Sequence, residues 1–476
     1  MMSGKLSYPE FLTWVYNELK GHQYGGVFCF NRPIIFLRDP DLIKTITVKD
    51  FEYFTDHLTI IKEEEDVLWG KGIFNLQGQR WKDMRSILSP AFTSTKMKTM
   101  FHLVSQCGKQ LIDFLDNCCN NHIPEKTCKV EKEGGLLVVE LKDLLTRYSN
   151  DVIATSAFGI GVDSLKKPSN EFYLMGKEAT NFRLYVWMGY SVFPKLMQML
   201  NIDLIPKKVK NFFRALIKNT MVTRERDGIE RPDLIQMLMQ TYKSRIQDDK
   251  MPLSKRKMDD DDLIAQAFLF FVAGFESTAT AMCFSCHQIG VYPEIESKLQ
   301  QEIDKVMRES GGNITYEAIN SMKYLDMVIS ETLRLFPPTG AMDRVCIKPY
   351  TLQADPPLDM KPGDGLWIPI YAVHQDPENF PDPEKFDPER FNDENKHNIK
   401  PSTYIPFGIG PRICIGSRFA LMETKILLVY LLHHFNLKVV SKTPNPVKIK
   451  KHGFIMVIEG GFWMGLEKRN QSRNML

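Results

Sequence analysis

The sequence predicts a mainly α protein with a minor β component, folded as one large domain. Amphipathic helical periodicity recurs over residues 101–121, 141–158 and 320–335. A long apolar segment follows four consecutive aspartates, Asp259–Asp262, which stabilise a helix N-terminus. That segment is expected to run as one buried helix to Gly290. The predicted strands are short, and neither an internal repeat nor a low-complexity linker divides the chain.

Composition places the chain among ordinary core-forming proteins. Of its 476 residues, 43% are hydrophobic and 25% are charged. The net charge of +3, from 61 basic and 58 acidic residues, argues against a nucleic-acid partner. Nine cysteines without framework spacing favour a reducing compartment. We expect neither a secretory signal nor a transit peptide in the opening residues, and the apolar run Leu263–Phe275 is too short to cross about 30 Å of hydrocarbon.

The first half of the chain is expected to alternate short helices, strands and charged loops. In chain order these are a helix within residues 1–20, strands at Gly26–Phe30 and Ile34–Leu37, a helix at Leu42–Lys49, a solvated acidic loop at 62–66, a helix from about Gln79, a helix at 101–121, a charged loop at 124–135 and a helix at 141–158. Tyr185–Phe213 is rich in aromatic residues and methionines. This segment is either a pair of core helices or a flap that touches ligand or membrane.

The second half is expected to hold the long helix, one further buried helix and an irregular, proline-rich stretch. Pro337 and Pro338 end the helix at Asn320–Leu335. The later elements are short strands at Thr351–Leu352 and Leu366–Pro369, a helix from Ser417 to about Phe435, and two strands within Ile455–Leu466 that form a hairpin around Gly460 and Gly461.

The glycine-rich loop Phe407–Gly416 carries the strongest chemical signal. Cys414 lies just before a predicted helix, where free N–H groups and the helix dipole lower a thiol pKa and suit a metal ligand. Glycines at 408, 410 and 416 would let the backbone approach a flat group closely. We therefore expect Cys414 to hold a haem iron. A dinucleotide-binding loop is the rival reading, but the glycine spacing is not GxGxxG.

Two further groups of polar residues fall in apolar helices. Glu331 and Arg334 lie three residues apart in a helix predicted to be buried, where unpaired charges are costly. Arg390 is expected to complete a buried ionic triad with them.

The second group interrupts the long helix. Gly274, Glu276, Ser277 and Thr278 are locally unfavourable there. In one reading the hydroxyls bond back to preceding carbonyls and Glu276 pairs with a distant base. In the other reading, Gly274 leaves room for a ligand while the acid and its neighbouring hydroxyl relay protons.

Two histidine-containing patterns are set aside. Cys283, Cys286 and His287 match the C-x-x-C-H pattern of covalent haem attachment, but they fall within a continuous helix in a chain without an export signal. His433 and His434 have no partner at metal-binding spacing and are expected at the surface.

Taken in order, these motifs resemble the cytochrome P450 superfamily of haem-thiolate monooxygenases. The family's F-x-x-G-x-R-x-C-x-G loop matches Phe407–Gly416, and its E-x-x-R matches Glu331 and Arg334. Its P-E-R-F, A-G-x-E/D-T and W-x-x-x-R motifs are matched at 388–391, at Ala273, Gly274 and Glu276, and at Trp81 and Arg85. More loosely, the segments at 48–51, 344–346 and 348–350 look like insect microsomal members, which are close to vertebrate drug-metabolising enzymes.

The resemblance has two departures. Ser277 stands where the family usually has threonine, which puts the positioning of the hydroxyl in doubt. The hydrophobic anchor and hinge of microsomal members are not found in this chain, so we expect residues 1–476 to form a single catalytic domain.

The resemblance implies a fold and a set of roles. Haem b (iron protoporphyrin IX) is expected between the long central helix and the helix that the cysteine loop precedes, with Cys414 as the axial thiolate. Catalytic roles fall to Glu276, Ser277 and Thr278, cofactor-binding roles to Trp81, Arg85, Arg344, Phe407, Gly408, Arg412, Cys414 and Gly416, and structural roles to Glu331, Arg334 and Arg390.

The resemblance also implies partners and a location. Electrons are expected from NADPH through a separate flavoprotein reductase, with cytochrome b5 as a possible second donor. The enzyme is expected at the cytosolic face of the endoplasmic reticulum membrane, in contact with its surface. Lipophilic substrates, such as plant toxins, insecticides or endogenous lipids, are expected in a pocket walled by Asp56–Phe74, Tyr185–Phe193, Phe268–Ser277, Thr339–Met342 and Gly461–Trp463.

Two other functions stay open beside the monooxygenase. One is a haem-thiolate isomerase or dehydratase that acts on peroxides, although such an enzyme needs no proton relay like that predicted at Glu276. The other is a non-catalytic haem protein.

Overall fold

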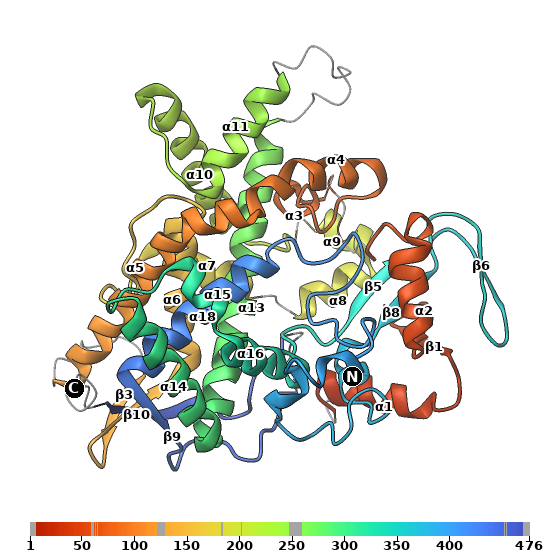
Figure 1. Cartoon of the computed structure of the whole chain (residues 1–476). Coiled ribbons are helices and arrows are strands. Elements are labelled where there is room, and N and C mark those ends of the chain that lie inside the picture. The colour runs from red at the N-terminus through yellow and green to blue at the C-terminus, as the bar shows by residue number, and fades with distance from the viewer. Residues whose placement is uncertain are drawn as a thin grey trace.

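The computed structural model is mainly helical with a minor strand component, which confirms the predicted fold class (Figure 1). It describes residues 6–58, 61, 63, 65–120, 129–181, 184–200, 202–246, 259–451, 453 and 455–469.

The helices run through the whole described chain. They are α1 (Tyr8–Glu18), α2 (Pro40–Lys44), α3 (Val67–Gly70), α4 (Gly78–Leu88), α5 (Ser94–Cys119), α6 (Leu141–Ser156), α7 (Glu171–Thr180), α8 (Leu184–Val192), α9 (Pro194–Met199), α10 (Lys207–Asp227), α11 (Leu234–Ile246), α13 (Asp260–Val291), α14 (Pro293–Glu309), α15 (Tyr316–Ser321), α16 (Lys323–Leu335), α17 (Ile370–His374) and α18 (Ser417–His434).

The strands form three small sheets. The strands are β1 (Tyr24–Cys29), β2 (Arg32–Leu37), β3 (Val130–Glu133), β4 (Leu136–Glu140), β5 (Met342–Val345), β6 (Tyr350–Leu352), β7 (Leu358–Met360), β8 (Gly365–Ile368), β9 (Phe435–Lys438) and β10 (Trp463–Lys468). Their orders are β1-β2-β8-β5, β3-β4-β10-β9 and β6-β7. The first sheet joins the start of the chain to the segment after α16, because β2 pairs in parallel with β8.

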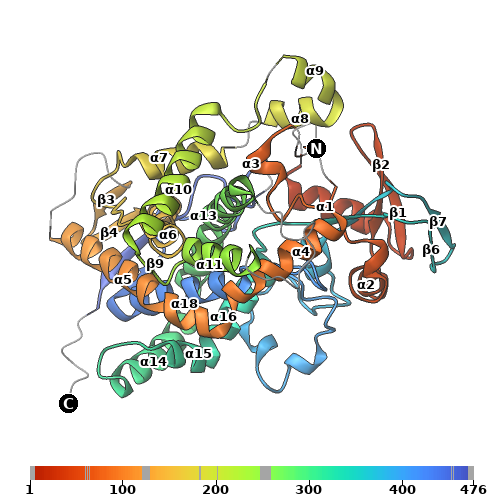
Figure 2. The same ribbon diagram turned by 90° about the horizontal axis from the view of Figure 1, so that it is seen from above.

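Helix α13 crosses the middle of the molecule, where Figure 2 shows it surrounded by other helices. Asp259 caps it and forms a reciprocal capping box with Asp262, as the run of aspartates predicts. It packs against α6, α3, α18, α10, α7 and α16. Among the described helices it alone is long and apolar enough to cross a membrane, yet 72% of its most apolar window is buried inside the protein. We therefore interpret it as the core helix.

The C-terminal hairpin predicted around Gly460 and Gly461 is wrong. β10 instead pairs with β4, from the middle of the chain, and with β9. The predicted charged loop at 124–135 is also wrong over Val130–Glu133, which forms β3; residues 124–128 lie outside the described residues. β3 is an edge strand whose charged side chains face solvent, so its sequence resembles a loop.

Three local predictions need smaller corrections. The helix expected at Leu42–Lys49 changes at Thr45 from α2 to a π-helical turn, η1 (Thr45–Lys49). The helix expected at Asn320–Leu335 is divided at Met322 into α15 and α16. The acidic run at 62–66 lies partly outside the described residues, but Asp66 is buried, not solvated, because it caps α3 and pairs with Lys210 at 3.3 Å.

The two patterns that were set aside have structural contacts. Cys283, Cys286 and His287 are buried in α13, and the His287 ring lies 2.9 Å from the carbonyl oxygen of Pro444. His433 is 21% exposed, in agreement with its expected place at the surface, and it pairs with Asp304 at 3.2 Å. The described residues contain no group of three or more side chains suited to a metal ion.

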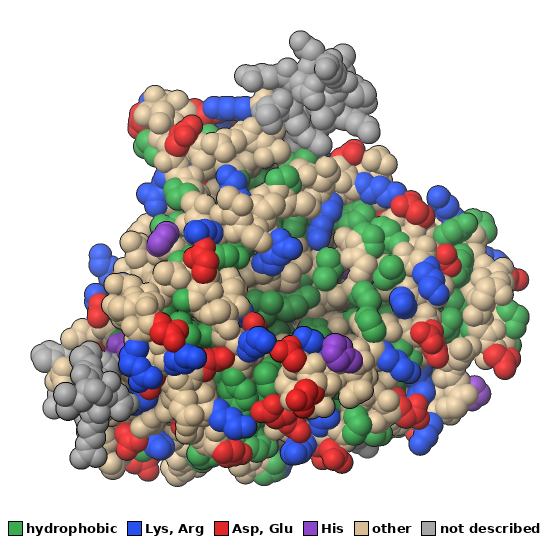
Figure 3. Space-filling model, viewed as in Figure 1, with side chains coloured by type: hydrophobic (Ala, Val, Ile, Leu, Met, Phe, Trp, Pro, Cys, Tyr) green, Lys and Arg blue, Asp and Glu red, His purple; other side chains and the backbone are tan. Residues whose placement is uncertain are grey.

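The face that carries α16 and α18 in Figure 1 is uneven. Figure 3 shows a hollow near its centre, with hydrophobic side chains inside it and lysine and arginine side chains among those around it.

Glu331 and Arg334 form a fully buried ion pair in α16. The Arg334 guanidinium donates to both carboxylate oxygens of Glu331 at 2.7 and 2.8 Å, and neither side chain is exposed. Arg390 lies 3.4 Å from the same carboxylate, and the backbone N–H of Asp387 donates to it at 2.9 Å. Burial raises the pKa of Glu331, although Arg334 lowers it. These contacts bring the predicted triad together and tie α16 to the segment before the cysteine loop.

The buried pair leads to a stability prediction. Arg334→Ala leaves the Glu331 carboxylate buried without its main partner, so the free energy of unfolding should fall by about 3–5 kcal/mol. Lys396→Ala is the control, because it removes an exposed pair with Asp393 at the same i, i+3 spacing. Urea unfolding of both variants tests this. The structural role is contradicted if Arg334→Ala loses no more stability than Lys396→Ala.

Candidate active site

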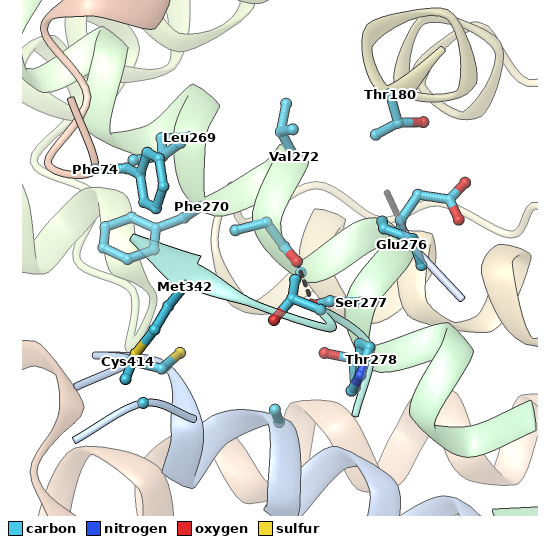
Figure 4. Close-up of a pocket in the computed structure, with 18 of the residues that line it drawn as sticks. Phe74, Thr180, Leu269, Phe270, Val272, Glu276, Ser277, Thr278, Met342 and Cys414 are labelled. Atoms are coloured by element: carbon cyan, nitrogen blue, oxygen red, sulfur yellow. Dashed lines mark hydrogen bonds between the residues drawn. The ribbon is translucent and has the colours of Figure 1, made fainter. Parts of the chain in front are cut away.

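A cavity of about 1780 Å³ lies between α13 and the loop before α18. Drug-sized ligands usually occupy about 300–1,000 Å³. The cavity therefore has room for a bulky cofactor and a second, substrate-sized molecule together. Figure 4 shows Cys414 on one side of this space, with Phe270 and Leu269 of α13 across from it.

Cys414 is accessible because it lines this cavity. Its backbone N–H donates to the carbonyl of Phe407 at 2.9 Å, which closes the loop upon itself. The backbone N–H of Ser417, at the start of α18, donates to the Cys414 carbonyl at 3.5 Å, and the amides of Gly416 and Ser417 lie close enough to the sulfur to lower its pKa. The thiol is thus held by the helix N-terminus, as the sequence predicts, and points into the space where a flat group would lie.

The predicted lowering of the Cys414 pKa is wrong for the protein by itself. Burial raises the pKa of this thiol, although the Gly416 and Ser417 amides and the Arg85 charge lower it. Protein surrounds the thiol on the sides away from the helix N-terminus. Desolvation therefore raises its pKa by more than the nearby backbone dipoles lower it.

The loop glycines serve two different purposes. At Gly410, φ is +79° and an added Cβ would lie 1.9 Å from the carbonyl oxygen of Thr47, so this glycine lets the loop press against η1. Gly408 has a similar φ of +76°, but a Cβ there would only touch the Met342 sulfur at 3.4 Å. Gly416 lines the cavity, with nothing within 4 Å of an added Cβ. Gly408 and Gly416 line the cavity and fit the prediction that a glycine makes room for a ligand, whereas Gly410 makes room for Thr47.

Arg412 is held by the protein itself. Its guanidinium donates to the carbonyls of Thr55 and Leu76, both at 2.7 Å, and to those of Ile73 and Phe74. It lies 4.1 Å from the centroid of the buried Trp81 ring, which explains how Trp81 contributes to this side of the cavity. Burial, together with the charge of Arg344, lowers the pKa of Arg412 to about 9.

Two more arginines line the cavity, and neither forms an ion pair with a described acid. Arg344 is 1% exposed, its Nε has no hydrogen-bond partner within the described chain, and burial lowers its pKa to about 10. Arg85 makes no ion pair with any described acid, and burial lowers its pKa. A buried, partnerless guanidinium N–H is costly, and guanidinium groups suit carboxylates. This end of the cavity therefore fits the carboxylate groups of a haem.

The polar break in α13 adopts the contacts of the structural reading. The Ser277 hydroxyl donates to the carbonyl of Ala273 at 2.5 Å. The Glu276 carboxylate pairs with Lys142 of α6 at 2.6 Å, and Lys142 also donates to the Thr280 hydroxyl at 2.8 Å. Figure 4 shows the Glu276 carboxylate turned away from Cys414, whereas Ser277 and Thr278 lie nearer the centre of the cavity. Glu276, Ser277 and Thr278 all line the cavity, so the proton-relay role stays a prediction.

The cavity walls agree with four of the five predicted segments. Residues from 56–74, 185–193, 268–277 and 339–342 line it. The fifth segment, Gly461–Trp463, does not line it, because it leads into β10 and packs beside Glu140. That wall of the cavity is formed instead by Lys450, Lys451, Gly453, Ile455 and Val457. Sequence reasoning missed this wall and Lys142, since neither lies in a motif.

Comparisons with known proteins give one consistent result. The family model described as Cytochrome P450 matches residues 11–464. The chain is 58% identical to cytochrome P450 9e2 of Blattella germanica over 98% of this chain and 89% of that protein. It is 40% identical to probable cytochrome P450 9f2 of Drosophila melanogaster over 96% and 88% of the two chains. Cytochrome P450 6k1 of Blattella germanica is 36% identical over 95% and 86%.

The contrast between Gly408 and Gly410 can be measured. Alanine at either position takes a left-handed conformation that costs about 1–2 kcal/mol. Gly410→Ala must also displace the Thr47 carbonyl, so it should destabilise the protein clearly more than Gly408→Ala does. Thermal unfolding of the two variants measures the difference. Equal losses would mean that the loop does not depend on its contact with η1.

Proposed function

The chain belongs to the cytochrome P450 family and is a haem-thiolate monooxygenase, and we propose that Cys414 is the residue that holds its iron. The observation that carries this proposal is the Cys414 thiol at the N-terminus of α18, directed into a cavity that has room for a cofactor and a substrate. The proposal extends to residues 1–476 as a single catalytic domain.

We propose that the cofactor is haem b and that its two propionates are held at the arginine end of the cavity. Arg344 supports this with its unpartnered Nε, and Arg85 supports it with a charge that no described acid balances. Arg412, stacked on Trp81, adds a third positive charge, and Phe407, Gly408 and Gly416 complete the wall on the cysteine side. When bound, the iron supplies oxygen activation, which thiolate ligation favours.

We propose that Ser277 and Glu276 deliver protons to dioxygen bound in the cavity. Thr278 lies beside them. Ser277 can turn its hydroxyl from the Ala273 carbonyl toward the cavity that it lines. Glu276, the residue before Ser277, is held by Lys142 of α6. Such positioned groups commonly contribute about 10²–10⁴-fold to rate.

P450 enzymes of this family take electrons from a redox partner, and we propose that the partner here is an NADPH-dependent flavoprotein reductase, with cytochrome b5 as a second donor. The sequence contains no flavin or nicotinamide motif of its own, which supports a separate donor.

We propose that the substrates are lipophilic compounds, such as plant toxins, insecticides or endogenous lipids. Phe74, Leu269, Phe270 and Val272 present mainly apolar groups above Cys414, which favours substrates without charge at the reacting end (Figure 4).

We further propose that α8 and α9 touch the cytosolic face of the endoplasmic reticulum membrane. Tyr185, Phe193, Leu196, Met199 and Leu200 are large, exposed and apolar, and in Figure 2 α8 and α9 project beside α1. Such a patch is typical of a membrane-contacting surface. It favours the flap reading of this segment, which binding of the purified chain to lipid vesicles would test.

The activity is tested by product formation with isotopically labelled O₂. The purified protein, a lipophilic compound, reductase and NADPH should give a product that contains one labelled oxygen atom, and omission of reductase or NADPH should abolish it. A product that forms from an organic peroxide without reductase, NADPH or O₂ would indicate the isomerase or dehydratase class instead.

The relay is tested at Ser277. Ser277→Ala should lower the amount of product per NADPH consumed by at least about tenfold while electron consumption continues, because proton delivery becomes uncoupled from reduction. Ser277→Thr should retain coupling. Ser285→Ala is the matched control, since Ser285 makes the same back-bond, to Ala281 at 2.9 Å, in a buried part of α13 that does not line the cavity. Unchanged coupling in Ser277→Ala would exclude the relay.

A further inference from the structure

The cavity wall that no sequence motif indicated carries two lysines that the proposed mechanism does not use. Lys450 and Lys451 both line the cavity, and both residues are exposed, so the cavity opens to solvent beside them. Lys450 lies in a short segment that runs antiparallel to residues 455–459. Its backbone N–H donates to the carbonyl of Val457 at 2.8 Å. Backbone pairing therefore fixes the position of Lys450 at the edge of the cavity.

The register of this antiparallel pair distinguishes Lys450 from its neighbour Lys448. The Glu459 N–H donates to the Lys448 carbonyl at 2.7 Å, so Lys448 lies opposite Glu459 and Lys450 lies opposite Val457. Directly opposed residues of an antiparallel pair place their side chains on the same face. Val457 and Lys450 line the cavity, whereas neither Lys448 nor Glu459 does. Lys450 therefore brings its charge to the cavity beside an apolar side chain.

The segment that pairs with Lys450 is fastened to the chain after α16. Ile455 forms an antiparallel bridge to Thr339, and the Met456 N–H donates to the carbonyl of Pro338 at 3.4 Å. Pro338, Thr339 and Ile455 all line the same cavity. The lysines are thus attached to a wall that also carries apolar lining residues, and they do not lie on a detached loop.

Positive charge exceeds negative charge in this part of the cavity. Neither Lys450 nor Lys451 forms an ion pair with a described acid. Three acidic side chains line the cavity, and each of them already has a partner. Further basic side chains that line the cavity outside its arginine end, again without an ion pair to a described acid, are Arg32, Lys177 and Lys208. The propionates proposed for the arginine end would leave the two lysines free to bind another anion.

The inner part of the cavity suits a different portion of a ligand. Around Cys414 it is lined mainly by apolar side chains, among them Leu269 and Phe270 (Figure 4). A pocket of this kind binds an apolar body, and a few polar groups fix the orientation of that body. Carboxylates form strong, charge-assisted hydrogen bonds with lysine ammonium groups. An apolar chain that ends in one carboxylate therefore matches both parts of the cavity.

We propose that Lys450 and Lys451 form an anion subsite at the opening of the cavity, and that long-chain carboxylates are the substrates bound there. The carboxylate stays with the lysines, and the apolar chain extends into the cavity toward Cys414. The inference rests on the proposed monooxygenase function, because it names a substrate class for the same site. One atom of O₂ enters a C–H bond of the chain and the other leaves as water, while two electrons from NADPH and two protons are consumed. The carboxylate itself is unchanged.

The subsite is tested by equilibrium dialysis of the haem-loaded full chain against three ligands that share one apolar chain: dodecanoate, its methyl ester and dodecylammonium. Dodecanoate should bind more tightly than the ester, and dodecylammonium should bind most weakly, because only the charge of the head group differs. Raising the ionic strength from about 0.1 to about 1 M shortens the screening length from about 10 to about 3 Å. The affinity for dodecanoate should therefore fall with salt relative to that for the ester.

The lysines are tested by the double variant Lys450→Gln/Lys451→Gln. Its dissociation constant for dodecanoate should rise by about fivefold, while that for the ester should not change. Lys448→Gln is the matched control, because Lys448 is an exposed lysine on the same face of the same segment that does not line the cavity. It should alter neither constant. Both substituted lysines are exposed and make no ion pair with a described acid, so the double variant should fold normally.

Three results would overturn the anion subsite. The first is equal affinity of the parent for dodecanoate and the ester, and the second is an equal effect of Lys448→Gln and the double variant. In the third, the double variant binds phosphatidylserine vesicles more weakly but keeps its affinity for dodecanoate, which would assign the lysines to a membrane surface. Dialysis requires no turnover. Lysine-dependent binding of dodecanoate without an oxygenated product would therefore support the subsite and contradict the monooxygenase function alone.

Discussion

The position of Cys414 depends on how its loop is anchored to the chain segments before α4. Gly410 presses against the Thr47 carbonyl, and Arg412 reaches over Trp81 to four backbone carbonyls between Thr55 and Leu76. These contacts hold the loop from one side, while the N-terminus of α18 holds the sulfur from the other. The thiol is thereby fixed before any cofactor binds, opposite α13 and at the edge of a cavity large enough for two ligands.

Charge is distributed unevenly around that cavity. Glu331 and Arg334 neutralise each other inside α16, and Glu276 is neutralised by Lys142. Arg85 has no such ion pair among the described residues, and the charge of Asp343 raises the pKa of Arg344 by less than burial lowers it. A buried positive charge is tolerated when a ligand brings the opposite charge. The two propionates of a haem would supply the negative charge. Cys414 and the arginines would then bind the same group.

Sequence reasoning succeeded where a function is concentrated in a short motif. The cysteine loop, the Glu331–Arg334 pair and the polar break in α13 were each located from local spacing, and the family comparison agrees with the motifs. Sequence reasoning failed where the partners lie far apart in the chain. β10 pairs with β4 across more than three hundred residues, and Lys142 of α6 forms an ion pair with Glu276 of α13. Sequence reasoning also misjudged the Cys414 pKa, because the degree of burial that opposes the helix dipole is a property of the folded core.

The most direct test of the account is the absorption spectrum of the reduced protein with carbon monoxide after haem is added. If Cys414 is the axial ligand, the complex should show the red-shifted Soret band of thiolate ligation, and Cys414→Ala should lose that band. A protein that binds haem but gives only the band of a neutral nitrogen ligand would contradict the assignment of Cys414. Retention of the thiolate band in Cys414→Ala would contradict it equally.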